Sequence, residues 1–95
     1  MIIVSQDRRM IINFENIVGV LIRKNVKEDI YQIQCKSENE KNARIIGKYK
    51  TEERAKEILQ EIYEFYEIAK RFECSSNNGV TIFTEPRFAY SMPEE

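Results

Sequence analysis

The segment Ile45–Leu59, with the sequence IIGKYKTEERAKEIL, carries the main signals for the fold of this chain. It begins with the end of an apolar run and continues into a long stretch with the periodicity of an amphipathic helix. Thr51 has the side-chain oxygen that an N-cap residue needs, and Glu52 and Glu53 follow where the helix dipole favours negative charge. The segment therefore predicts a junction between a strand and a helix over residues 51–73.

The same segment contains a Gly-Lys pair, which raises the question of a phosphate-binding loop. In such a loop a first glycine lies five residues before the Gly-Lys pair, because the main-chain amides must turn inward around the phosphates. That position is Asn42, and Lys48 is followed by Tyr49 instead of the Ser or Thr that would bind Mg²⁺. The spacing argues against nucleotide binding, and we interpret Gly47 and Lys48 as part of a strand.

Residues 1–50 contain short apolar runs separated by polar turns, which predict a β-meander of five antiparallel strands. Along residues 31–36, Tyr, Ile and Cys alternate with Gln, Gln and Lys. Alternation of this kind is typical of an antiparallel strand with one buried face. We therefore expect Gln32, Gln34 and Lys36 on the outer face of the sheet.

The predicted fold class is α+β in a single domain, residues 1–95. It consists of a five-stranded antiparallel meander, one long amphipathic helix packed on it, and a short C-terminal strand. Glu94 and Glu95 are expected to fray at the end of the tail. The predicted boundaries are 1–50 for the meander, 51–73 for the helix, 80–85 for the last strand and 86–95 for the tail.

Composition excludes several classes of chemistry. The chain has no histidine, which removes His-dependent triads, His-based zinc sites and His acid–base catalysis. Its two cysteines, Cys35 and Cys74, lack CxxC spacing and are expected to be reduced thiols. A carboxylate-only metal site has little support, because Asp occurs only at Asp7 and Asp29. We expect no catalytic, cofactor-binding or metal-binding residues, and no enzyme.

The apolar runs are short. None approaches the roughly 18 apolar residues of a membrane span, and no signal peptide is visible at the N-terminus. We therefore expect a cytoplasmic protein without membrane contact.

Charge is distributed unevenly along the chain. Residues 1–50 hold ten Lys/Arg and six acids, a net charge of +4, whereas residues 51–95 hold five Lys/Arg and ten Glu, a net charge of −5. One interpretation is an ordinary solvated surface. The alternatives are a basic face for a polyanion, or two faces that attract each other between molecules. The candidate polyanion contacts are Arg8, Arg9, Arg23, Lys24 and Lys27.

The apolar stripe of the predicted helix is wider than one sheet face requires. Its excess positions include aromatic residues, which are enriched at the cores of protein interfaces. The stripe predicts self-association as a homodimer, and the alternative is that the C-terminal segment wraps the helix within one chain. The candidate interface residues are Tyr63, Phe65, Ile68, Phe72, Phe83, Phe88 and Tyr90.

Three short stretches carry a resemblance to a known group of proteins. These are MIIVSQD at the start, GKYKTEERAKEILQEI in the middle and MPEE at the end. With them the chain resembles a family of small uncharacterised proteins found in low-GC Gram-positive bacteria and in their phages and mobile elements. The resemblance implies a shared fold and brings no known activity or catalytic residues.

These observations favour a non-enzymatic binding or adaptor module of bacterial or phage-related origin that associates with itself or with another protein. The alternative is a nucleic-acid-associated accessory protein that uses the basic meander.

Overall fold

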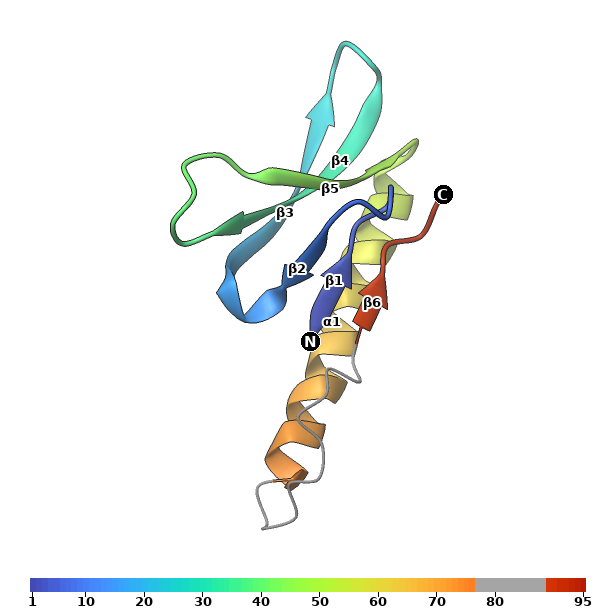
Figure 1. Ribbon diagram of the computed structural model, residues 1–95. Coiled ribbons are helices and arrows are strands. Elements are labelled where there is room, and N and C mark those ends of the chain that lie inside the picture. Colours follow the sequence, from blue (N-terminus) through green and yellow to red (C-terminus); the bar gives the residue numbers. More distant parts are fainter. Residues whose placement is uncertain (77–88) are drawn as a thin grey trace.

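The computed structural model describes residues 1–76 and 89–95, with side chains described for 1–71 and 89–95. Within these residues the chain forms one long helix and two three-stranded sheets, with strand orders β2-β1-β6 and β3-β4-β5 (Figure 1). The α+β class is therefore confirmed. The prediction of a single five-stranded meander is wrong, because the five strands divide between two sheets.

The first sheet is small and joins the two ends of the described chain. It consists of β1 (Ile2–Val4), β2 (Ile11–Asn13) and β6 (Ala89–Ser91). β1 pairs antiparallel with β2 and parallel with β6. The sequence predicted only a tail at the position of β6. The predicted strand 80–85 lies outside the described residues.

The second sheet is the antiparallel meander β3 (Ile17–Asn25), β4 (Ile30–Ser37) and β5 (Arg44–Tyr49). A short 3-10 helix, Phe14–Asn16, separates β2 from β3. This turn of helix bends the chain, so that β2 pairs with β1 while β3 pairs with β4. The bend is the physical reason why one predicted meander becomes two sheets.

Gln6 joins the two sheets. Its main-chain N–H donates to the carbonyl of Ile46 at 2.8 Å. Its side-chain amide then forms two hydrogen bonds with Lys48, in which Nε2 donates to the carbonyl at 3.0 Å and Oε1 accepts from the N–H at 2.7 Å. Ile46 can accept from Gln6 because β5 has a register shift at this point in its pairing with β4.

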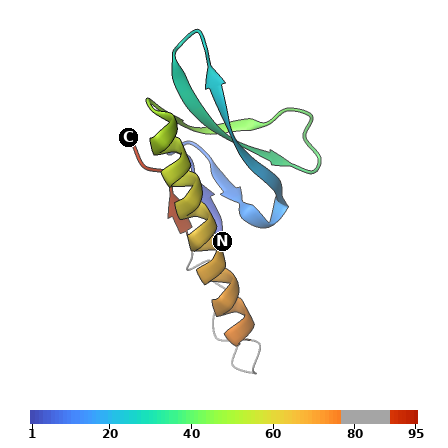
Figure 2. The same cartoon turned by 180° about the vertical axis from the view of Figure 1, so that it is seen from behind.

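The helix α1 (Glu52–Ser76) begins where the sequence predicted. The Arg54 N–H donates to the Thr51 side-chain oxygen at 3.1 Å, which confirms Thr51 as the N-cap. The helix is about 37 Å long at 1.5 Å per residue. It crosses one face of the β3-β4-β5 sheet, and its last turns extend past the strands (Figures 1 and 2).

The core lies between α1 and the two sheets. The helix contributes Ala55, Ile58, Ile62 and Ala69, which recur at three-, four- and seven-residue steps and are at most 2% exposed. The strands and the C-terminal segment contribute the remaining buried apolar residues, namely Met1, Ile3, Ile33, Cys35, Ile46, Tyr49, Tyr90 and Met92.

Candidate functional site

The five predicted polyanion contacts do not form one patch. Arg8 lies in the turn between β1 and β2 with a positive φ of 62°. Its Nη1 donates to the main-chain carbonyls of Ser5 at 3.3 Å and Met92 at 3.0 Å. Asp7 stabilises the same turn, since hydrogen bonds from the Ser5 hydroxyl and the Arg9 N–H lower the pKa of its carboxyl. Arg8 therefore has a structural role, whereas Arg9 is exposed.

The other three basic residues also point in different directions. Arg23 and Lys24 are consecutive in β3, so their side chains lie on opposite faces of the sheet. Lys24 Nζ lies 3.7 Å from the Asp29 carboxylate and 5.6 Å from the centre of the Tyr31 ring. Lys27 is exposed in the turn between β3 and β4. Only Arg23 belongs to the sheet face directed away from the helix.

The outer face of the second sheet carries a group of residues that the predicted site largely missed. Cross-strand pairs place Arg23 opposite Gln32, and Gln32 opposite Lys48. The next row runs from Leu21 through Gln34 to Ile45. Together with Lys36 these residues form what we call the basic sheet face, which consists of Leu21, Arg23, Gln32, Gln34, Lys36, Ile45 and Lys48.

The charge of these strands is of one sign. Along the described residues of β3, β4 and β5 there are five Lys or Arg residues and no Asp or Glu. Gln32 and Gln34 are buried on this face at 7% and 8% exposure, and the Gln34 amide donates to Gln32 Oε1 at 2.8 Å. Ile45 is 39% exposed beside them. The face therefore carries polar and positive side chains, with Leu21 and Ile45 as its apolar members.

Alternation along β4 could have located part of this face from the sequence, because it already placed Gln32, Gln34 and Lys36 outward. The pairing confirms that these residues face away from the buried Ile33 and Cys35. The close packing of the two glutamines was not expected from their polarity.

The predicted interface residues are also separated. Phe65 packs against Tyr90, with ring centres 5.8 Å apart and an interplanar angle of 65°. The Tyr90 hydroxyl donates to Glu61 Oε1 at 2.7 Å, and burial together with this hydrogen bond raises the pKa of Tyr90. These two aromatic residues therefore meet within one chain. This contact agrees with the wrapping alternative for this part of the stripe.

Tyr63 and Ile68 remain exposed, at 57% and 54%. They lie about 140° apart around the helix axis at ~100° per residue, so they cannot belong to one compact patch on α1. A hydrogen bond with Glu67 raises the pKa of Tyr63. The side chain of Phe72, and all of Phe83 and Phe88, lie outside the described residues.

Four side chains hold the end of the described chain. They bind four consecutive main-chain carbonyls, and we call this arrangement the tail clamp. Because these carbonyls have partners, the structure contradicts the prediction that the last residues fray. The donors and acceptors are Arg8 Nη1 to Met92 at 3.0 Å, Tyr49 Oη to Pro93 at 2.7 Å, Gln6 Nε2 to Glu94 at 2.7 Å and Arg54 Nε to Glu95 at 2.9 Å.

Tyr49 is the buried member of the tail clamp, at 2% exposure. Burial raises the pKa of Tyr49 to about 12, so its hydroxyl stays a donor well above neutral pH. The ring lies over Gly47, where an added Cβ would come within 2.7 Å of the ring and 3.1 Å of the Met92 methyl group. Gly47, considered above for a phosphate loop, is therefore a packing glycine.

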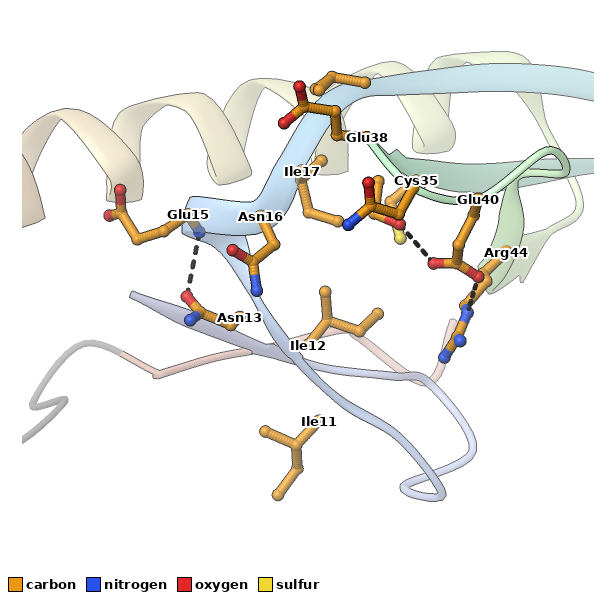
Figure 3. A pocket seen from close by; sticks show the side chains of 13 residues that line it. Ile11, Ile12, Asn13, Glu15, Asn16, Ile17, Cys35, Glu38, Glu40 and Arg44 are labelled. Atoms are coloured by element: carbon orange, nitrogen blue, oxygen red, sulfur yellow. Dashed lines mark hydrogen bonds and ion pairs between the residues drawn. The ribbon is translucent and has the colours of Figure 1, made fainter.

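A cavity of about 400 Å³ opens between β2, the 3-10 helix and the β4–β5 loop (Figure 3). Glu40 lies at its rim and accepts from the Ser37 hydroxyl at 2.6 Å and from Arg44 Nε at 2.7 Å. These two hydrogen bonds lower the pKa of Glu40. Cys35 lines the inner side, where burial raises the pKa of its thiol. A thiol in this environment is a poor nucleophile at neutral pH.

Two further properties concern the described residues only. In residues 1–76 and 89–95, no three His, Cys, Asp or Glu side chains are grouped so that they could hold a metal ion. No helix in the same part of the chain is long and apolar enough to cross a membrane.

Comparison of the chain with models of protein families, with curated proteins and with solved structures finds no match in any of the three.

Proposed function

We propose that this protein is a non-enzymatic binding module, of bacterial or phage-related origin, that docks an acidic partner on the basic sheet face. The observation that supports the proposal is the single sign of charge on β3, β4 and β5. Arg23, Lys36 and Lys48 project on the side away from α1. An acidic surface brought to this face would meet three cations, and the carboxylate beside them is that of Glu28 in the β3–β4 turn, 4.0 Å from Lys48 Nζ.

The composition of the face favours a protein partner. Leu21 and Ile45 lie between the cations, and the two glutamine side chains already bond to each other. Protein interfaces combine apolar contacts with a charged rim, and Leu21 and Ile45 could supply such contacts on either side of the glutamine pair. Recognition of single-stranded nucleic acid commonly uses aromatic side chains for base stacking, whereas the aromatic residues of β4 and β5, Tyr31 and Tyr49, lie on the opposite face of the sheet from Gln32 and Lys48.

Binding to nucleic acid is the second candidate, since the all-positive strands would also attract phosphates. The two candidates differ in their salt dependence and in their response to DNA. Phosphate contacts release counterions, so the affinity for DNA would fall steeply as salt is raised.

The side chains that could act as acid, base or nucleophile support a non-enzymatic role. The chain contains no histidine. Burial raises the pKa of the Cys35 thiol, which disfavours the thiolate. Hydrogen bonds from Ser37 and Arg44 hold the Glu40 carboxylate in its ionised form, which makes it a weak general base.

Fluorescence anisotropy tests the proposal with a labelled poly-glutamate peptide and with labelled single-stranded and duplex DNA, each at two salt concentrations. The test variant replaces Arg23, Lys36 and Lys48 with Gln. If each cation contributes about 0.5 kcal/mol, the variant should bind the peptide about tenfold more weakly.

A matched control variant loses the same charge elsewhere, through Arg9→Gln, Lys41→Gln and Lys56→Gln. It should bind the peptide like the wild type apart from a small general effect of net charge. Equal loss in both variants would remove the basis for a specific face. Binding of DNA in preference to the peptide would instead support the nucleic-acid candidate.

A further inference from the structure

One flank of α1 carries a row of three acidic residues that ends in an isoleucine. Glu57, Glu61, Glu64 and Ile68 follow at steps of four, three and four residues, so they lie in one line along the helix within about 60° of each other at ~100° per residue. We call these four residues the acidic helix ridge. Ile68 lies at its C-terminal end and is 54% exposed.

The acidic helix ridge and the basic sheet face are separated by the β3-β4-β5 sheet. The inner side of α1 faces the sheet. It carries Ala55, Ile58 and Ile62, and the sheet residues in the same buried core include Ile33 and Cys35. The ridge lies on the flank of the helix next to β6, about 120° around the axis from the buried stripe, where Glu61 accepts from the Tyr90 hydroxyl, and the basic sheet face lies on the far side of the sheet. The two views of the ribbon show α1 on one side of the strands (Figures 1 and 2).

We propose that the acidic partner of the basic sheet face is the acidic helix ridge of a second copy of this chain. This inference rests on the proposed function, because it assigns the occupant of the same face. One molecule cannot bring its own two surfaces together, since the β3-β4-β5 sheet lies between them. The contact must therefore form between copies.

The two surfaces match in charge and in apolar content. Three carboxylates on the ridge would meet Arg23, Lys36 and Lys48 on the sheet. Ile68 on the ridge and Ile45 on the sheet are both exposed and would supply an apolar contact beside the charged residues. Opposite charges orient the encounter, and burial of apolar side chains adds stabilisation that exposed ion pairs alone lack.

Partners within the chain still leave the ridge acidic. Arg54 Nη1 lies 3.3 Å from the Glu57 carboxylate and 4.0 Å from the Glu61 carboxylate. Glu61 also accepts from the Tyr90 hydroxyl. One guanidinium thus faces two of the three ridge carboxylates, and its own Nε is held by the tail clamp. Glu64 lies one turn before Ile68 and contacts the neutral amide of Gln60 at 3.4 Å.

The arrangement is head-to-tail, because each copy presents its acidic helix ridge to one neighbour and its basic sheet face to another. Such heterologous contacts form a ring if the rotation closes and a chain if it does not. The predicted two-fold dimer through the whole helical stripe would require Tyr63 and Ile68 on one surface. The head-to-tail arrangement uses Ile68 and leaves Tyr63 outside the contact.

A charge-swap experiment on the full chain tests the proposal by sedimentation. The sheet variant carries Arg23→Glu, Lys36→Glu and Lys48→Glu, and the ridge variant carries Glu57→Lys and Glu64→Lys. Glu61 is kept because it accepts from Tyr90. Circular dichroism and urea denaturation of each variant establish that it is folded before association is measured.

The wild type should show a mass that rises above the 11.3 kDa of one chain as concentration increases, and added salt should reduce it. Each variant alone should sediment as a monomer, because its two surfaces then carry like charges. Their mixture should associate again, since the reversed sheet of one variant faces the reversed ridge of the other, and each wild-type ridge faces a wild-type sheet. A mixture that stays monomeric would overturn the proposal.

Single substitutions on α1 add a second readout. Ile68→Glu should abolish association, whereas Tyr63→Ser, at a similarly exposed position on the other flank of the helix, should leave it unchanged. If both variants dissociate the assembly, the two-fold stripe is the interface and the head-to-tail contact is wrong. If the wild type is monomeric throughout while poly-glutamate still binds the basic sheet face, this inference fails and the proposed function stands.

Discussion

Replacing Gly47 with Ala should destabilise the protein through the tail clamp. A Cβ at this position would lie 2.7 Å from Tyr49 Cε2, 2.8 Å from Tyr49 Oη and 3.1 Å from Met92 Cε. Atoms at these distances overlap, so the Tyr49 ring must move. The ring has little freedom, because it is buried and its hydroxyl donates to the Pro93 carbonyl at 2.7 Å. Relief of the overlap therefore weakens the hydrogen bond that holds the tail.

Three effects determine how much the Gly47→Ala substitution changes the free energy of unfolding. Overpacking of a buried site costs about 1–3 kcal/mol. Loss of the Tyr49–Pro93 hydrogen bond costs about 1 kcal/mol. Alanine lowers the entropy of the unfolded chain relative to glycine, which returns about 0.4–1 kcal/mol. The net loss in the free energy of unfolding should be about 1–3 kcal/mol, with a melting temperature lower by roughly 4–8 °C for each kcal/mol in a domain of this size.

Urea denaturation of the wild type and the Gly47→Ala variant measures this difference, and Gly19→Ala is the matched control. Gly19 also lies in a strand of the second sheet, but an added Cβ there meets nothing within 4 Å. The control should be unchanged or slightly more stable than the wild type. If the Gly47 variant is as stable as the Gly19 variant, the close packing of Tyr49 over Gly47 is not what fixes the tail.

Two further predictions concern the helix start and alkaline pH. Thr51→Ala should lower the free energy of unfolding by about 0.5–2 kcal/mol, because the Arg54 N–H loses its side-chain acceptor; an unchanged urea midpoint would contradict this. Burial raises the pKa of Tyr49 to about 12, against about 10 in an unfolded chain. Tyr49 therefore contributes fully to the free energy of unfolding below about pH 10. This contribution falls by about 1–3 kcal/mol as the pH rises to about 12. Tyr49→Phe should lose less stability over this pH range, and equal losses would refute the assignment.

The helix could be predicted from the sequence because its signals are local. Thr51 and the acidic residues after it mark the first turn, and buried residues recur at helical spacing up to Ala69. The class α+β follows once this helix is combined with the strand-like first half. The predicted end at residue 73 differs by three residues from the observed end at Ser76, because a sequence pattern locates the end of a helix less exactly than its existence.

The division into two sheets could not be predicted, because it depends on contacts between distant residues. The pairing of β1 with β6 joins residues at opposite ends of the chain. The side-chain amide of Gln6 forms two hydrogen bonds with the main chain of Lys48, as the backbone of a neighbouring strand would do. A glutamine after a short apolar run carries no pattern that would distinguish this role from that of an ordinary turn residue.

Part of the basic sheet face could be predicted from the sequence. The register shift in β5 prevented prediction of the rest. Ile45 and Lys48 are three residues apart, so a regular strand would place them on opposite faces. The register shift in β5 inserts Ile46 as an extra residue, and both side chains then face outward opposite Gln34 and Gln32. Periodicity alone cannot locate such a bulge.

The tail clamp also limits which basic residues are available to a partner. Arg8 and Arg54 each donate to a carbonyl of the last four residues, and Lys24 lies beside the Asp29 carboxylate. A partner that engaged Arg8 or Arg54 would have to displace the tail, and with it the pairing of β6 on β1. Binding at the basic sheet face would disturb the 4.0 Å ion pair of Lys48 with Glu28 but not the tail, because Arg23 projects from a strand that is paired on its β4 side and lies away from the clamp. The surface that can bind at the lowest conformational cost is therefore the sheet face opposite the helix, where the sheet variant of the charge-swap experiment carries its substitutions.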